Sequence, residues 1–393
     1  MTKVIVPIYL DHAAATPIDP AVLEAMRPYR EDQFANPSSL YSAARVTRLA
    51  VEGARATVAD FLGAKTTEII FTSGGTEGDN LAVQGVLRAH PGAHWVATAI
   101  EHDAVLGCVE PLKRDGHEAA VVPVKPDGVV DVAAIASAIS DRTVLISVML
   151  ANNEIGTIQP IPDLAKLVAD VQADRAKRDI KLPLYLHTDA VQAANYINLS
   201  VSRLGVDLLT LNGSKIYGPK GTGALYVRHG TTIEPLIYGG GQERGRRSGT
   251  ENVAGVVGLG AALKLAATTR DAEFYRLAPL RDQLIRGIQA AIPDAILNGH
   301  PSRRLPNNVN FTIPGAEGEG LVLYLDNAGI LASTGSACST GSLDPSHVLI
   351  AIGRTPDEAN SSLRLTLGRS TDQAAVDKVI ETLPGIIHRL RTL

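Results

Sequence analysis

The sequence predicts an α/β protein with a large domain around a mostly parallel sheet and a second, smaller domain. Short β-branched runs alternate with longer helical patterns over most of the 393 residues. From about Gly255 the sequence pattern changes. A small-residue helix is followed by a stretch rich in Pro, Asn and Gly, then by two strand-like runs and terminal helices. This change predicts a smaller α+β domain in the C-terminal part of the chain.

Seven short apolar runs predict the strands of the large sheet. They are residues 68–72, 94–99, 120–124, 144–149, 184–187, 207–210 and 223–227. Helical patterns accompany them at 42–62, 77–90 and 161–178. Asp19 and Thr76 each provide a capping side chain at a helix start. We therefore expect a seven-stranded sheet flanked by helices.

The smaller domain is predicted from a helix at 255–268 and two strands at 309–313 and 330–333. We expect the N-terminal segment to pack back on this part of the chain. The predicted boundaries are therefore residues 16–254 for the large domain, with 1–15 and 255–393 together forming the small one.

Composition excludes several classes of protein. The chain has 37 Lys+Arg against 41 Asp+Glu and is 45% apolar, which argues against a disordered chain and gives no general attraction to nucleic acid or an anionic membrane. Its two cysteines, Cys108 and Cys338, are too few for a disulfide framework or a cysteine-based metal site. Neither a signal-peptide pattern nor ~18 uninterrupted apolar residues occurs. We expect a cytoplasmic protein that holds no metal.

A glycine-rich turn at residues 71–78, FTSGGTEG, joins a predicted buried strand to a helix. Helix N-termini present unpaired N–H groups and favour a phosphate, and glycines let the backbone approach it closely. Turn chemistry alone also explains such a segment, which matches neither a P-loop nor GxGxxG.

Two polar residues follow other predicted strands. Lys215 lies in a glycine-rich turn, where an apolar setting would lower the pKa of its amine and make it a Schiff-base nucleophile. Asp189 lies where parallel strands open into a ligand crevice and could pair with a protonated ring nitrogen. Each residue also has an ordinary interpretation, Lys215 as a solvated loop lysine and Asp189 as a helix cap or surface carboxylate.

Together these segments resemble the cysteine desulfurases of the NifS/IscS type, in the class V aminotransferase family of fold type I pyridoxal phosphate (PLP) enzymes. The resemblance covers essentially the whole chain in the family's order. The segments are YLDHAAATP (9–17), NPSS (36–39), FTSGGTEGDN (71–80), EH (101–102), ANNEIGTIQ (151–159), HTDAVQ (187–192), SKIYGPKG (214–221), GGGQERGRRSGTENV (239–253), SACS (336–339) and LRLTLGR (363–369).

The resemblance implies how the cofactor ring is held. Lys215 would bind PLP covalently, and Asp189 would pair with the pyridine nitrogen. Gln192 would hydrogen-bond the ring hydroxyl, and His102 would stack on the ring face. Lys215 and His102 are therefore expected to be catalytic.

The resemblance also implies how the phosphate is held. Gly75 and Thr76 would cradle it at the helix start, while Thr250 would reach the partner subunit's cofactor phosphate in a homodimer. The chain departs from the family where Asn212 and Ser214 replace the usual serine and histidine. Both side chains still form hydrogen bonds but lose a possible positive charge, so PLP binding is expected to survive.

For the substrate, the resemblance implies that Arg364 binds the carboxylate of L-cysteine as a bidentate fork and that Asn153 contacts the ring or substrate. Cys338, in a run of small residues, would be the catalytic thiol that takes the sulfur as a persulfide while alanine leaves. Cys108 reads as a small apolar packing residue.

The predicted function is a PLP-dependent cysteine desulfurase that passes sulfur to an acceptor or scaffold protein, as in iron–sulfur cluster assembly. Two alternatives on the same fold are a selenocysteine lyase and an aminotransferase acting on another amino acid. A third is a non-catalytic sulfur-assembly scaffold, suggested by the altered residues before Lys215. Direct nucleic-acid binding is not expected, because no aromatic side chains interleave with the arginines of residues 239–250.

Overall fold

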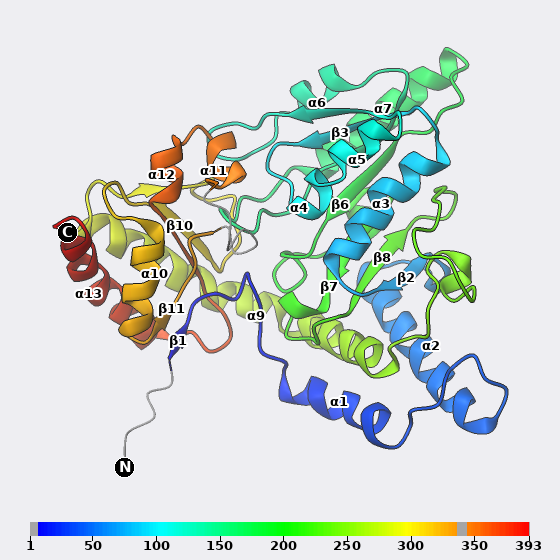
Figure 1. Ribbon diagram of the computed structural model, residues 1–393, viewed down its shortest axis with the longest axis horizontal. Coiled ribbons are helices and arrows are strands. Elements are labelled where there is room, and N and C mark those ends of the chain that lie inside the picture. The colour runs from blue at the N-terminus through cyan, green and yellow to red at the C-terminus, as the bar shows by residue number, and fades with distance from the viewer. Residues whose placement is uncertain (1–6, 336–343, 393) are drawn as a thin grey trace.

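The computed structural model describes residues 7–335 and 344–392 and has a large and a small lobe (Figure 1). A seven-stranded sheet forms the centre of the large lobe. Its strands are β2 (Ile69–Thr72), β3 (His94–Thr98), β4 (Glu118–Val122), β5 (Thr143–Ser147), β6 (Tyr185–Asp189), β7 (Leu208–Asn212) and β8 (Gly223–Val227). They lie in the order β2-β8-β7-β6-β5-β3-β4, and β8 runs antiparallel to the other six strands. The predicted fold class is confirmed.

Apart from the partly exposed edge strand β4, the sheet is buried on both faces, because successive strand residues enter different hydrophobic clusters. On β2, Ile69 and Phe71 pack in one cluster while Ile70 packs in the other. The first face is covered by α2 (Ser42–Leu62), α7 (Ile161–Lys177) and part of α9; the second is covered by α3 (Gly75–Ala89) and the short helices α4 (Asp103–Leu106) and α5 (Val109–Arg114).

The small lobe contains a second sheet and a pair of strands. β10 (Asn308–Thr312) lies between β9 (Ile296–Leu297) and β12 (Ser362–Thr366), all antiparallel. The N-terminal strand β1 (Ile8–Tyr9) pairs in parallel with β11 (Ile330–Leu331), so the N-terminal segment joins the C-terminal part of the chain. The helices of this lobe are α10 (Gly318–Asn327), α11 (His347–Ala351), α12 (Pro356–Asn360) and α13 (Gln373–Leu390).

Helix α9 (Val253–Ala291) joins the two lobes and is much longer than the helix predicted at 255–268. Leu259 and Leu263 pack in the core of the large lobe, whereas Leu277 and Leu284 pack in the core of the small lobe. The hydrophobic cores therefore divide within α9, and the predicted domain boundaries remain predictions.

Among the described residues, α9 is also the one helix long and apolar enough to cross a membrane. Half of its most apolar window is buried inside the protein, as in many core helices. Its neighbours include α2, α13 and α1 (Pro20–Glu31). The remaining helices are α6 (Val132–Ala138) and α8 (Val201–Leu204).

Candidate active site

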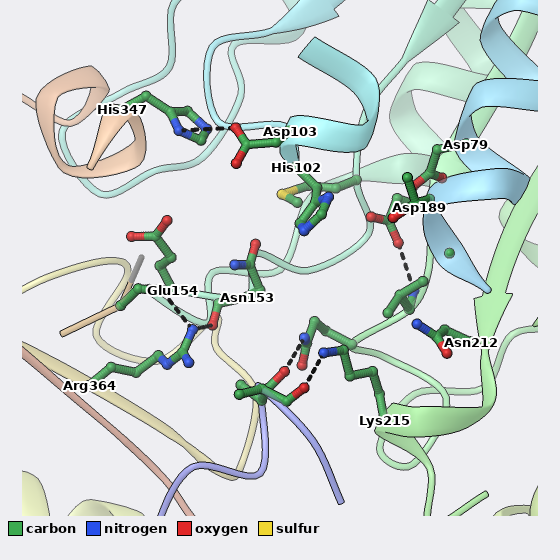
Figure 2. A pocket seen from close by; sticks show the side chains of 18 residues that line it. Asp79, His102, Asp103, Asn153, Glu154, Asp189, Asn212, Lys215, His347 and Arg364 are labelled. Carbon is green, nitrogen blue, oxygen red and sulfur yellow. Dashed lines mark hydrogen bonds and ion pairs between the residues drawn. The ribbon is translucent and has the colours of Figure 1, made fainter. Parts of the chain in front are cut away.

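A cavity of about 360 Å³ lies where the carboxyl ends of β6 and β7 meet the start of α3 and the small lobe (Figure 2). Its lining brings together twelve polar side chains, some predicted and some newly found, with Ala13 and Ala14 of the N-terminal segment. The lining residues are Ala13, Ala14, Gly75, Thr76, Asp79, His102, Asp103, Met149, Asn153, Glu154, Asp189, Val191, Gln192, Asn212, Lys215, Gly335, His347 and Arg364.

Lys215 ends a 3₁₀ turn that follows β7, and its side chain enters this cavity. Its Nζ donates a hydrogen bond to the carbonyl oxygen of Ala14. Gln192 Nε2 donates to the carbonyl oxygen of Ala13 at 3.0 Å. The N-terminal segment therefore forms one wall of the cavity beside the predicted Schiff-base lysine. Local sequence patterns did not indicate this wall.

Asp189 is the last residue of β6 and is only 7% exposed. Burial, together with the nearby negative charge of Asp79, raises the pKa of Asp189 to about 7, against the lowering effect of His102. A cationic group opposite Asp189 would favour its charged form. The site therefore suits a cationic group opposite Asp189, where the sequence resemblance places a protonated ring nitrogen.

Asp79 stands behind this position on α3 and is 1% exposed. Its Oδ1 atom lies 3.5 Å from Nε2 of His187 and has no hydrogen-bond partner among the described residues. Sequence reasoning missed Asp79, although it lies three residues, about one helical turn, after Thr76 on the same helix.

His102 is the N-cap residue of α4 and points into the cavity near Asp189 (Figure 2). Its Nδ1 accepts a hydrogen bond from the backbone N–H of Ala104 at 3.0 Å. The neutral ring therefore carries its proton on Nε2. This contact fixes the ring on one side of the cavity, where the sequence resemblance places a stacking histidine.

The first residues of α3 form the predicted phosphate cradle. A Cβ atom on Gly75 would lie 3.0 Å from Cγ2 of Val191 and 3.6 Å from Nδ2 of Asn212, so there is little room for a larger residue. The first N–H groups of a helix have no partner within it. Gly75 and Thr76 thus present backbone donors toward the cavity.

Two other predicted phosphate ligands do not line this cavity. The hydroxyl of Ser214 donates to Oδ1 of Asn212 at 3.1 Å instead. Thr250 is exposed. Its segment nevertheless approaches the start of α3, because Nε of Arg247 donates to Oε1 of Glu77 at 2.8 Å.

Arg364 lies on β12 and enters the cavity from the small lobe. It is 2% exposed, and its Nη2 pairs with Oδ1 of Asp11 at 2.8 Å. Nη1 donates to the carbonyl oxygens of Gly335 at 2.9 Å and Asn153 at 3.2 Å. Figure 2 shows the Asn153 side chain between Arg364 and His102.

Three further side chains at the cavity were not expected from sequence: Glu154, Asp103 and His347. Nε2 of His347 donates to the carbonyl oxygen of Glu101 at 2.9 Å, and its Nδ1 lies 3.8 Å from Oδ1 of Asp103. Glu154 lies inside the segment at 151–159 and Asp103 directly follows the segment at 101–102, so the resemblance could have indicated both, whereas His347 lies in none of these segments. Burial raises the pKa of Glu101 to about 8.

The two cysteines lie in different parts of the chain, one in the segment between Gly335 and Asp344 and one in the core of the large lobe. Cys338 lies outside the described residues, although Gly335 and His347 on either side of its segment line the cavity. Cys108 is buried, and burial raises the pKa of its thiol to about 11, so it is an inert packing residue as predicted. Within residues 7–335 and 344–392, no three His, Cys, Asp or Glu side chains gather as metal ligands would.

A buried carboxylate, a lysine amine and a helix N-terminus around one cavity at the carboxyl ends of parallel strands are the features of an α/β enzyme that uses a phosphorylated ring cofactor. The profile of the aminotransferase class-V family matches residues 8–379. The chain therefore belongs to the class-V aminotransferase family, whose members are generally PLP-dependent.

Close relatives carry the name cysteine desulfurase. The chain is 48% identical over 390 residues to cysteine desulfurase IscS of Clostridium botulinum, covering 98% of this chain and 96% of the relative. It is 47% identical over 388 residues to cysteine desulfurase IscS of Methanosarcina thermophila, covering 98% of this chain and 93% of the relative.

Solved structures agree with these relatives. A NifS-like protein superposes with a TM-score of 0.88 at 33% identity, covering 98% of this chain and all of the other. A structure described as SspA in complex with cysteine superposes with a TM-score of 0.76 at 34% identity, covering 92% of this chain and 98% of the other.

Proposed function

We propose that this protein is a PLP-dependent cysteine desulfurase that converts L-cysteine to L-alanine and receives the sulfur as a persulfide on Cys338. The observation that carries the proposal is the single cavity in which Lys215, Asp189 and Arg364 meet. The names of the relatives and the neighbouring structure with cysteine support the same reaction.

The residues of the cavity fit PLP. Asp189 would pair with the ring nitrogen, since burial leaves this carboxylate in need of a cationic partner. Gly75 and Thr76 would hold the phosphate with backbone N–H groups, assisted by Asn212. Lys215 would hold the cofactor covalently. Bound PLP supplies an electron sink for the bonds at the substrate α-carbon.

The protein's own groups would orient the substrate and move its proton. Arg364 would bind the α-carboxylate, with Asn153 beside it, because Nε of this buried arginine has no hydrogen-bond partner among the described residues. Lys215 would move the proton of the substrate α-carbon. His102 would stack on the ring face and limit its tilt.

Cys338 would perform the sulfur transfer. Its thiolate attacks the sulfur of the substrate, an S–S bond forms, and the C–S bond breaks with its electron pair going to the substrate Cβ. A proton added to Cβ completes L-alanine. The role of Cys338 rests on the sequence resemblance, and the described residues Gly335 and His347 at the cavity are compatible with it.

We further propose a homodimer in which Thr250 completes the partner's phosphate site. Thr250 is exposed, and the nearby ion pair of Arg247 and Glu77 keeps its segment close to a phosphate cradle. Large apolar side chains shortly before α2 are exposed, Phe34 by 83% and Leu40 fully. Exposed apolar side chains of this size favour a protein–protein contact at this place. Sedimentation equilibrium tests this, and a monomer at micromolar concentration would contradict it.

The persulfide must leave Cys338 before another turnover, so we propose a sulfur-acceptor or scaffold protein as partner, as in iron–sulfur assembly. We propose a cytoplasmic location without direct membrane or nucleic-acid binding. The near-neutral charge and the small number of cysteines support this proposal.

A product assay on purified protein tests the proposed reaction. Wild type should yield alanine and, with a thiol reductant, sulfide from L-cysteine. Cys338→Ala should keep the visible absorption of the bound cofactor and its change on adding L-cysteine, but form no alanine. Cys108→Ser is the matched control and should remain active. Alanine production by Cys338→Ala would refute the role of this thiol, and a keto acid as main product would indicate an aminotransferase.

A further inference from the structure

Arg364 is a deeply buried cation that already has a counter-ion. Among the described residues, Asp11 is the only carboxylate at ion-pair distance from its guanidinium, with Nη2 and Oδ1 2.8 Å apart. The two side chains are 2% and 20% exposed. An ion pair so far removed from water is weakly screened, so its charges act strongly on any ligand beside it.

The guanidinium retains donors for a ligand. Of the five N–H groups of an arginine, three in Arg364 are used: one by Asp11, one by the carbonyl of Gly335 and one by the carbonyl of Asn153. Among residues 7–335 and 344–392, the N–H on Nε and one N–H on Nη2 have no acceptor. Two donors are what a bidentate carboxylate requires, so Asp11 leaves the binding capacity of Arg364 intact while it neutralises the charge.

Asp11 is held in this position by its backbone. It forms a parallel bridge to Thr366 on β12, two residues from Arg364. The hydroxyl of Tyr9 donates to the carbonyl oxygen of Asp11 at 3.0 Å, and the N–H of Ala13 donates to Oγ1 of Thr366 at 2.9 Å. These contacts hold the backbone of Asp11 against β12, and the ion pair places its carboxylate beside Arg364.

The other charged groups at the cavity do not cancel the charge of Asp11. Glu154 on the same side adds a second carboxylate, whose Oε2 accepts a hydrogen bond from Ser346 at 2.6 Å. Lys215 and His102 lie across the cavity, where PLP would engage them. A carboxylate that binds Arg364 therefore meets an ion pair and not an isolated positive charge.

We propose that Asp11 is the counter-ion that limits how tightly Arg364 holds a substrate or product carboxylate. This inference rests on the proposed function, in which Arg364 binds the carboxylate of L-cysteine. Its chemical consequence is that L-alanine, which carries the same carboxylate, is released readily once sulfur has been transferred. Removing the charge of Asp11 while keeping a hydrogen-bond acceptor is expected to tighten carboxylate binding.

The chain provides a matched control. Asp19 pairs with Nη1 of Arg369 at 2.8 Å, and both residues lie a few positions beyond Asp11 and Arg364 in the same two segments. Neither of them lines the cavity. Asp19→Asn thus weakens a similar ion pair between the same two segments and leaves the residues around Arg364 unchanged.

Calorimetric titration of the PLP-loaded enzyme with L-alanine tests the proposal without turnover. Asp11→Asn is expected to lower the Kd for L-alanine about threefold or more, because a buried charge opposing the ligand is gone. Asp11→Glu, which keeps the charge, and Asp19→Asn should both stay near the wild-type Kd. Thermal unfolding checks that each variant is folded, and Asp11→Ser replaces Asp11→Asn with the same expected tightening if the latter is not.

The outcomes separate this inference from the proposed function. Arg364→Lys should weaken L-alanine binding. If it does and Asp11→Asn leaves the Kd unchanged or raises it, the counter-ion role is refuted and the carboxylate site stands. If Arg364→Lys leaves binding unchanged, the carboxylate role of Arg364 is wrong and the inference falls with it. If Asp19→Asn also lowers the Kd for L-alanine, the effect comes from loosening the contact between the two segments. That result would contradict a specific role of Asp11.

Discussion

The two ends of the cavity draw their residues from different parts of the chain. The end around Asp189 and Lys215 is built by neighbouring strands of the large sheet and the start of α3. The end around Arg364 is assembled from segments as distant as Asp11 and β12, 353 positions apart. The first end is therefore fixed mainly by the large sheet, with Ala13 and Ala14 as one wall, whereas the second depends on contacts between the two lobes and the N-terminal segment.

This difference separates the expected effects of substitutions. Changes around Asp189 and Lys215 should alter cofactor binding and its spectrum. Changes around Arg364 should alter substrate affinity and leave cofactor binding intact. An effect that crosses from one end to the other would contradict the separation.

The largest effect is expected for Lys215→Ala. Without its amine the protein loses the covalent attachment of PLP and the group that moves the substrate proton, so alanine formation should fall to background. The visible absorption band of the covalently bound cofactor should disappear with it. Persistence of that band would mean that another lysine, such as Lys220, holds the cofactor.

A slightly smaller loss is expected for Asp189→Asn. The amide cannot stabilise a protonated ring nitrogen, so kcat should fall about a hundredfold or more, as when one preorganised electrostatic contact is removed. Steady-state kinetics and a PLP titration measure the change. An unaltered kcat with weaker PLP binding would restrict Asp189 to a role in affinity.

At the other end, Arg364→Lys should act on the substrate alone. Lysine keeps the charge but not the fork, so KM for L-cysteine should rise about 10- to 100-fold, the equivalent of one or two charge-assisted hydrogen bonds. The Kd for PLP should not change. A parallel rise in the Kd for PLP would break the separation between the two ends.

The smallest effect concerns the pH dependence of stability. The folded pKa of Glu101 is raised to about 8 by burial, so its contribution to stability is complete below the unfolded pKa near 4.5 and is lost as pH rises to about 8. Glu101→Gln should therefore lose less free energy of unfolding between pH 5 and pH 8 than wild type, by about 1 kcal/mol or more. Urea unfolding of the cofactor-free protein at both values checks this, and equal losses would refute it.

The sequence predicted the large sheet well because all its strands except the edge strand β4 are buried on both faces. Such strands appear as continuous apolar runs, as at 144–149 and 223–227, and their ends can be located within a few residues. Asp189 and Lys215 follow such runs directly. Their convergence on one cavity is therefore the part of the site that local patterns could predict.

The rest depends on contacts between segments far apart in sequence. The second half of α9 was missed because its apolar stripe continues beyond a charged stretch at 270–276 and packs on a different core. The pairing of Asp11 with Arg364 and the position of Ala14 against Lys215 arise from tertiary packing, which no local period encodes. For the same reason Glu154 and His347 were found only in the structure.

The central claim is that sulfur from L-cysteine becomes bound to Cys338. Its most direct test is a single turnover of the PLP-loaded enzyme with L-cysteine in the absence of reductant, followed by peptide mass analysis and alanine quantification. The account predicts about one alanine per active site, as a single persulfide allows, and a gain of one sulfur atom on the peptide that contains Cys338. Alanine without that gain, or the added sulfur on the peptide of Cys108, would contradict it.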